Sequence, residues 1–219
     1  MKTVTLISFL LFFASTVFAE KPKETMNITG ERMEVLKRGE ITRFLGNVRL
    51  VRGKDVVVSD LMEHYEKKNY VIGKGNVHFT AYPEESIRLE AFSDRLTYNL
   101  QSRDTTLTGN PELIRINEGE SQGTVKIRGE IIELFGREKK AQVKTGARVE
   151  YGGMTALSEI LDYDYETRKI VLSGGAPHIY QEDEQVTADY SAEVITIFVD
   201  EQRVVMEGNV KAFIYPKKT

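Results

Sequence analysis

The chain has 219 residues, 33 of them acidic and 30 basic, with neither cysteine nor tryptophan. Charges of both signs are mixed along it without a basic block, which argues against nucleic acid as a partner. Without cysteine, the fold must be stable without disulfides, and thiolate zinc sites are excluded.

The first nineteen residues have the pattern of a secretory signal peptide. Lys2 precedes an apolar run from Val4 to Phe18, and Ala19 closes a short site of small residues. The run is short for a membrane-spanning helix. We therefore expect cleavage after Ala19 and export of one domain, residues 20–219. An uncleaved membrane anchor is the alternative, and the mass of the exported N-terminus separates the two.

The rest of the chain repeats a six-residue pattern: small, acidic, any residue, apolar, polar, apolar. The pattern begins at Gly30, Ser59, Ser93, Gly129, Ser158 and Ala192. A glycine follows each start after 16 or 17 residues, at Gly46, Gly75, Gly109, Gly146, Gly175 and Gly208. Three of these glycines open the triplet Gly-Asn-Val. Six matches at a nearly constant spacing indicate an internal repeat.

Within each repeat, apolar and polar residues alternate with a period of two, which predicts half-buried strands. Short polar or glycine-rich turns separate these segments, as in a zigzag of antiparallel strands. We expect an all-β fold: a single antiparallel sheet of about six repeated units between residues 27 and 215. Glycine inside a strand marks a bend or bulge. Six glycine corners would fold the sheet into an open trough, a β-jelly roll with an apolar inner face.

The alternation assigns one set of residues to the inner face and another to the ends of the sheet. The expected inner face consists of Met33, Val35, Val48, Leu50, Met62, Val77, Phe79, Leu96, Tyr98, Leu113, Ile132, Leu134, Leu161, Tyr163, Ile179, Ile195 and Ile197. The first and last strands, within Met26–Leu36 and Val204–Tyr215, should be open edges with unpaired backbone groups. The expected edge contacts are Ile28, Met33, Val35, Val205, Val210 and Phe213.

Motifs for catalysis, nucleotides or metals are not found in the sequence. The stretch IGKGN lacks the Ser or Thr of a phosphate-binding loop, and the three histidines (His64, His78 and His178) do not stand at metal-ligand spacing. The acids of the repeat recur once per unit, unlike a catalytic carboxylate pair. Solvated strand ends or hydrogen bonds at bulges explain them better. We predict no enzyme activity, no cofactor and no metal site.

The strands FLGNV and LTGN, the strands that begin Ser-Asp (SD-x-L-x-Y) and the signal peptide resemble the OstA-like family of LptA-type proteins. The similarity covers roughly Asn27 to Tyr215. It implies a periplasmic module that carries lipopolysaccharide or a related envelope glycolipid between the inner and outer membranes. The inner-face residues would form the lipid groove. The two edges would add strands to LptC-like and LptD-like proteins, and head-to-tail self-association would be possible.

Other interpretations remain open from the sequence. The repeats could form a structural β-roll or solenoid of the envelope, stacked for stability alone and without lipid cargo. The chain could also be a membrane-anchored LptC-like component that keeps residues 1–19. An enzyme acting on envelope glycolipids ranks last, because the sequence contains no recognisable site for it.

Overall fold

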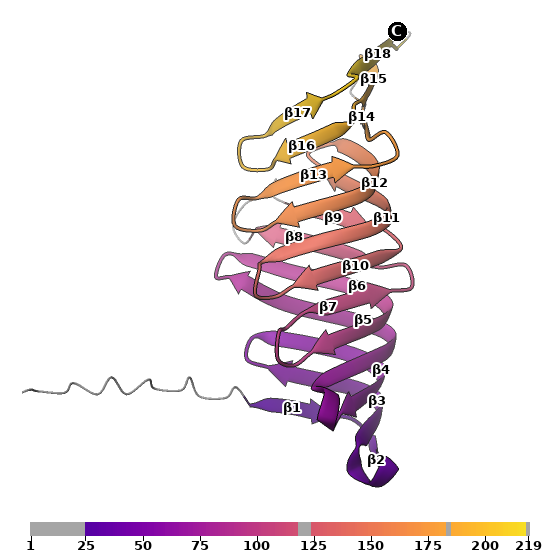
Figure 1. Ribbon diagram of the computed structural model, residues 1–219, viewed down its shortest axis with the longest axis vertical. Helices are drawn as coiled ribbons and strands as arrows, with labels where there is room; N and C mark the ends of the chain where they lie inside the picture. The colour runs from indigo at the N-terminus through magenta and orange to yellow at the C-terminus, as the bar shows by residue number, and fades with distance from the viewer. Residues whose placement is uncertain (1–24, 118–123, 183–184, 218–219) are drawn as a thin grey trace, which may run out of the picture.

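The computed structural model describes residues 25–117, 124–182 and 185–217, so the expected signal peptide lies outside the described residues. The described residues form one antiparallel sheet of 18 strands, elongated along one axis with β1 and β18 at opposite ends (Figure 1). Two short 3-10 turns, η1 (Lys37–Gly39) and η2 (Glu66–Lys68), complete the elements. The all-β fold expected from the alternation is confirmed.

The strands build a series of rungs, each folded once at a corner. Six rungs are single long strands: β3 (Ile41–Arg52), β4 (Asp55–Tyr65), β5 (Tyr70–Glu84), β6 (Ile87–Asn99), β11 (Lys140–Tyr151) and β12 (Met154–Asp164). The other rungs are pairs of short strands placed end to end. These pairs are β1 (Met26–Thr29) with β2 (Arg32–Leu36), β7 (Thr105–Thr108) with β8 (Glu112–Asn117), β9 (Val125–Arg128) with β10 (Ile131–Phe135), β13 (Lys169–Ser173) with β14 (His178–Glu182), β15 (Val186–Ser191) with β16 (Val194–Phe198), and β17 (Arg203–Glu207) with β18 (Lys211–Pro216).

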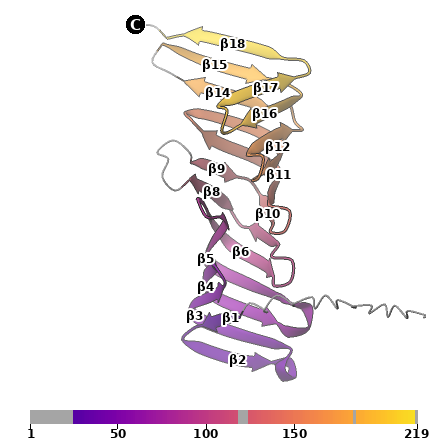
Figure 2. The same ribbon diagram turned by 90° about the vertical axis from the view of Figure 1, so that its left-hand side faces the viewer.

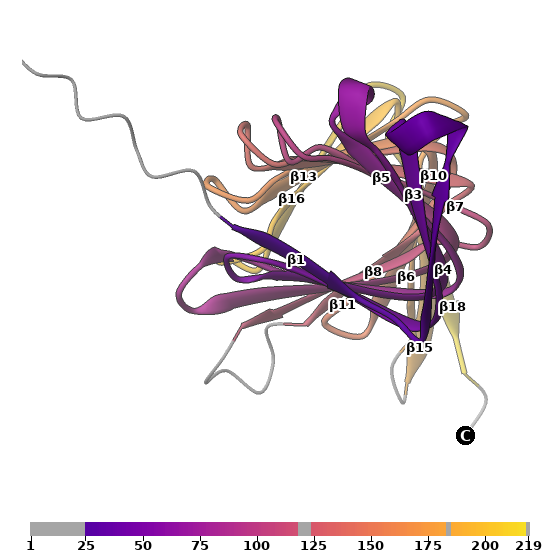
Figure 3. The ribbon, with the colours of Figure 1, turned by 90° about the horizontal axis from the view of Figure 1, so that it is seen from below.

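Folding at the corners produces two walls. The first wall runs β2, β3, β4, β5, β6, β7, β10, β11, β12, β13, β16, β17. The second runs β1, β3, β4, β5, β6, β8, β9, β11, β12, β14, β15, β18. Seen from the side and along the long axis, the walls form a twisted roll (Figures 2 and 3). Each long strand therefore contributes one half to each wall.

The Gly-Asn pairs explain how a strand turns the corner without ending. Gly46 and Asn47 have φ of 75° and 45°, and Gly75 and Asn76 have φ of 76° and 45°. Left-handed backbone is open to glycine and tolerated by asparagine. At each of these points the bending strand contains one residue more than the strand it pairs with, for example between Leu45 and Val48 in β3. Such a bulge bends the strand and returns the following valine to the inner face.

The acid of each repeat occupies the neighbouring corner, which explains the 16-residue spacing. Asn76 Nδ2 donates to Asp60 Oδ2 at 2.8 Å, and Asn47 Nδ2 and Asn209 Nδ2 each donate at 2.5 Å to Glu31 and Glu193, respectively. The acids thus serve bulge hydrogen bonds, one of the two explanations expected from the sequence. The expected count of six corners was too low: the acid positions are corners as well, so every rung bends.

The two ends of the sheet are open edges, as the sequence predicts. β1 and β2 pair on one side only, with β3, while β17 pairs only with β16 and β18 only with β15 among the described strands. Large apolar side chains stand exposed there, including Met33 at 60% and Ile214 at 60%. An open edge that carries apolar side chains favours pairing with another chain.

Candidate functional site

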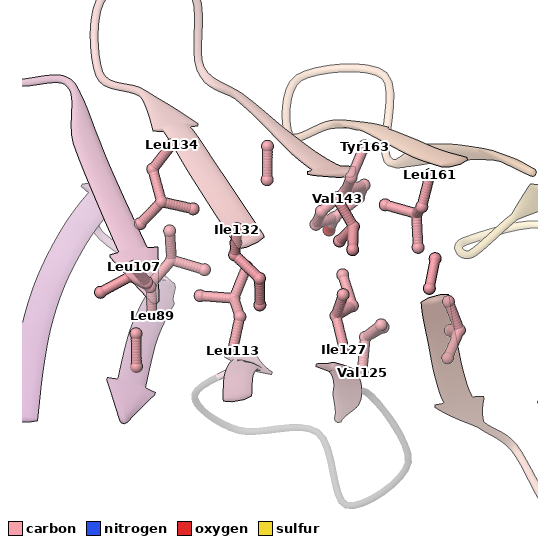
Figure 4. Packing of buried hydrophobic residues seen from close by; sticks show 14 of the residues in the cluster. Leu89, Leu107, Leu113, Val125, Ile127, Ile132, Leu134, Val143, Leu161 and Tyr163 are labelled. Carbon is pink, nitrogen blue, oxygen red and sulfur yellow. The ribbon is translucent and has the colours of Figure 1, made fainter. Parts of the chain in front are cut away.

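The inside of the roll is the candidate site, and it is lined by two apolar stripes that face each other. The inner-face residues that follow an acid corner, such as Met62, Leu96 and Ile132, lie on the first wall. Those that follow a glycine corner, such as Val77 and Leu113, lie on the second. Figure 4 shows Ile132 and Leu134 on one side of the interior and Leu113 on the other.

All the expected inner-face residues are buried except Met33 and Val35, which stand exposed at 60% and 61%. These two lie on β2, which pairs only with β3 among the described strands, so no further described rung covers their side chains. Of the expected edge residues, Ile28 lies on β1, Val205 on β17 and Phe213 on β18, while Val210 directly precedes β18. Contact of these residues with lipid or with partner proteins stays a prediction.

Sequence reasoning missed half of the lining, because it considered only the residues after each corner. The residues before the corner also alternate and are fully buried, among them Val57, Leu107, Ile127, Val143 and Leu172. Their signal was present in the period-two pattern, but each bulge shifts its phase by one residue. Both halves of a rung therefore contribute to one continuous apolar cluster.

Two polar side chains interrupt this interior on β8. Arg115 is fully buried and Asn117 is 9% exposed. Both lie on the same inward face of the strand as Leu113, at every second residue. Burial raises the pKa of Tyr163 on the opposite wall, and the positive charge of Arg115 acts in the other direction. Burying a cation is costly unless it is paired and hydrogen-bonded. The sequence analysis named Leu113 on this strand and passed over its polar neighbours.

The side opposite the corners, which we call the seam, is where the turns of the two walls meet. Two buried tyrosines bridge it. The hydroxyl of Tyr98 on the first wall donates to Asp55 Oδ2 on the second at 2.9 Å, and burial raises the pKa of this tyrosine. The hydroxyl of Tyr151 on the second wall donates to the carbonyl oxygen of Val199 at 2.7 Å. The walls are therefore joined at the seam by hydrogen bonds as well as by packing.

The outer face of the roll is covered by cross-strand ion pairs. Glu63 contacts Arg43 at 2.8 Å and Lys74 at 3.1 Å. Partial burial alone would raise the pKa of Glu63, but the hydrogen bonds from Arg43 and Lys74 outweigh it and hold the pKa below its usual value. Arg128 similarly lies between Glu112 and Glu150. The outer face is thus suited to water, and the apolar surface is turned inward.

Metal and membrane features were sought in residues 25–117, 124–182 and 185–217. That part of the chain holds no cluster of three or more His, Asp or Glu side chains able to bind a metal ion. It also holds no helix with the length and hydropathy needed to cross a membrane. Two of the three histidines make local contacts: His78 stacks on Phe92 at 4.5 Å between ring centroids, and His178 Nδ1 lies 3.2 Å from Asp189 Oδ1.

Comparisons with known proteins identify a matching family and two similar chains. Residues 27–140 match a family model described as LptA/(LptD N-terminal domain) LPS transport protein. The LPS-assembly protein LptD of Aliivibrio fischeri (strain ATCC 700601 / ES114) is 25% identical over 88 residues, which are 40% of this chain and 10% of that protein. The chain thus spans about a tenth of this curated relative.

A solved structure is also similar. It is LptH from Pseudomonas aeruginosa, described as the LptA homologous periplasmic component of the lipopolysaccharide transport device. The two chains are 18% identical with a TM-score of 0.49, and the match covers 55% of this chain and 82% of LptH.

Proposed function

The chain belongs to the LptA/(LptD N-terminal domain) LPS transport protein family, and from this membership we propose that it is a periplasmic module that shields the acyl chains of lipopolysaccharide. The cargo would lie between the two walls of the roll, with its polar part toward water. The observation that carries the proposal is the apolar interior, which runs through every rung and ends at an open strand edge on either side.

The physical need for such an interior follows from the cost of exposing hydrocarbon. Each methylene left in water costs roughly 0.8 kcal/mol, so a chain of about a dozen carbons costs on the order of 10 kcal/mol. Aliphatic side chains on both walls offer many similar contacts and few directional ones. A lipid could therefore move along the roll without a deep energy minimum.

The closed packing of the interior sets a condition on this function. Leu96, Ile132 and Leu161 are fully buried by other side chains, so a lipid can enter only if the walls move apart. The walls are continuous at the corner and meet at the seam through side chains, so the seam is the side that opens. The same packing favours the second candidate, a structural roll without cargo, and an experiment must separate the two.

Localisation and partners complete the proposal. We expect cleavage after Ala19, a periplasmic domain of residues 20–219, and strand addition of LptC-like and LptD-like proteins at the two edges. Family membership supports these partners, and the exposed apolar side chains of the edge strands supply a surface for them. We expect no catalysis and no cofactor, so the energy for transport would come from another protein.

Site-specific photocrosslinking in intact cells tests the function. A photoreactive residue at Leu96, Ile132 or Leu161 faces the interior, whereas the matched positions Thr97, Glu133 and Asp162 are the next residues on the outer face of the same strands. We expect lipopolysaccharide adducts at the inner positions alone. A folded, exported protein with no adduct at any inner position would instead be the structural roll.

A further inference from the structure

A small cavity crosses the seam in the middle of the roll. Its volume is about 140 Å³, too small for a whole lipid but sufficient for a head group or a few carbons. The second wall contributes Asp55, Phe79, Ala81, Tyr82, Pro83 and Leu89. The first wall contributes Arg103, Thr105, Leu134, Phe135, Gly136, Lys139 and Tyr165. Four of these, Phe79, Leu89, Leu134 and Tyr165, belong to the apolar interior, so the cavity connects the seam to the groove.

Two hydroxyl groups in this cavity lack a hydrogen-bond partner within the described part of the chain. They belong to Thr105, which is 1% exposed, and Tyr165, which is 3% exposed. Burying a hydroxyl without a partner costs about 1–3 kcal/mol, so a folded protein rarely keeps two of them in one place. Burial also raises the pKa of Tyr165, which keeps its hydroxyl protonated and able to donate.

Two cations line the cavity together with the carboxylate of Asp55, which accepts the hydrogen bond from Tyr98, and backbone contacts hold the surrounding turns. Arg103 and Lys139 both line it, and Lys139 Nζ lies 2.7 Å from Glu166 Oε1 at the surface. The backbone nitrogen of Tyr165 donates to the carbonyl oxygen of Lys139 at 2.9 Å. Gly136 allows the turns to meet, because a Cβ there would lie 2.8 Å from the carbonyl oxygen of Arg103. The three turns on this side of the seam thus support one another.

We propose that this seam cavity binds the anionic head group of an acylated amphiphile, with Thr105 and Tyr165 donating to its oxygens and Arg103 and Lys139 supplying positive charge at the rim. The attached hydrocarbon would continue over Phe79, Leu89 and Leu134 into the groove. Any ligand of this site would carry phosphate or carboxylate oxygens attached to a hydrocarbon tail. The inference rests on the proposed lipid-carrying function. It makes the seam cavity the place where a lipid enters the roll from the side.

The test uses the purified mature protein and three probes in titration calorimetry: monododecyl phosphate below its micellar concentration, dodecyl maltoside, and inorganic phosphate. We expect monododecyl phosphate to bind more tightly than either of the others. Thr105→Val and Tyr165→Phe should each weaken it by about tenfold, the usual effect of losing a hydrogen bond to a charged group. Ala81→Trp, which fills the cavity from its second wall, should abolish binding.

Matched variants and a stability measurement separate binding from folding. Thr106→Val removes a hydroxyl from the outer face of the same strand, and Tyr180→Phe removes one from an exposed ring; both should leave binding unchanged. Because neither cavity hydroxyl has a partner within the described part of the chain, Thr105→Val and Tyr165→Phe should unfold at the same or a higher denaturant concentration than the wild type. Weaker binding in a protein of equal or greater stability identifies a binding role.

Two results would overturn the inference. The first is equal binding of inorganic phosphate alone or of dodecyl maltoside. The second is monododecyl phosphate binding that Thr105→Val, Tyr165→Phe and Ala81→Trp all leave unchanged. If lipopolysaccharide adducts still form at Ile132 in cells, the proposed function stands and the seam site alone is wrong. If both the adducts and the binding are absent, the lipid-carrying function fails as well.

Discussion

At the scale of single residues, the acid and the Gly-Asn pair of the repeat allow the strands to bend. Asn76 in left-handed backbone reaches the acid of the preceding rung, Asp60, at 2.8 Å, and Gly75 leaves room for that acid because it has no side chain. A Cβ at Gly75 would lie 2.5 Å from Asp60 Oδ2 and 3.2 Å from Asp60 Cβ. Glycine is therefore required here for two reasons, its backbone angle and the close approach of the carboxylate.

Replacing two corner glycines separates these reasons. Gly75→Ala combines left-handed strain with a clash, whereas Gly146→Ala, at φ 66° with nothing within 4 Å of the new Cβ, has strain alone. We expect about 1–2 kcal/mol of destabilisation for Gly146→Ala and about 1 kcal/mol more for Gly75→Ala. Urea unfolding of the two variants measures the difference. Equal losses would show that Asp60 moves aside without cost.

At the scale of elements, the two walls depend on each other across the seam. The corner joins them covalently along the whole roll, while the seam has side-chain contacts such as the hydrogen bond from Tyr98 to Asp55. Tyr98 also packs near Phe79, with ring centroids 6.1 Å apart. The seam is consequently where a local change can loosen the roll without breaking a strand.

Removing one seam hydroxyl should therefore destabilise the protein measurably. Tyr98→Phe keeps the ring and loses the hydrogen bond to Asp55, at an expected cost of about 1–2 kcal/mol. Tyr180→Phe, at an exposed ring, is the control and should change the free energy of unfolding by less than about 0.5 kcal/mol. Chemical denaturation measures both. The opposite ranking would mean that this seam bridge has no stabilising role.

At the scale of the whole molecule, acid corners and glycine corners alternate from one end to the other. The first rung carries the acid Glu31, and the last carries Gly208 and Asn209. A second copy added head to tail would thus place a glycine corner next to an acid corner, as β3 lies next to β4. The strands would also meet antiparallel. Unlike edges that match in this way permit open-ended association.

The internal β3–β4 pairing predicts the register of that junction. Phe44 pairs with Met62 there, and the equivalent residues are Met206 in the last rung and Met33 in the first. In a chain with no native cysteine, Met206→Cys combined with Met33→Cys should form disulfide-linked oligomers. Met206→Cys with Glu34→Cys, one residue out of register, should not. Non-reducing electrophoresis reads the result, and oligomers from the second pair alone would refute the register.

Much of the architecture could be predicted because it depends on local sequence patterns. The period-two alternation predicted the strands and about half of the buried inner-face residues, and the recurring glycines predicted bends, since glycine there relieves a backbone constraint. The open edges were predicted because an unclosed sheet leaves its first and last strands with unpaired backbone groups. Met33 and Val35 show the limit of this reasoning, because alternation reports which face a residue is on and not whether another rung covers it.

The tertiary structure decided what lies between distant segments. Only the pairing of the strands showed that each acid corner lies beside a glycine corner, because the spacing of about 16 residues places the two side by side on neighbouring rungs. The seam cavity joins turns that are far apart in the chain, such as those near Ala81, Thr105 and Tyr165. Local sequence patterns determine the backbone conformation of a segment and the face of the sheet on which each side chain lies. Which side chains from the two walls come into contact depends on how the sheet folds as a whole.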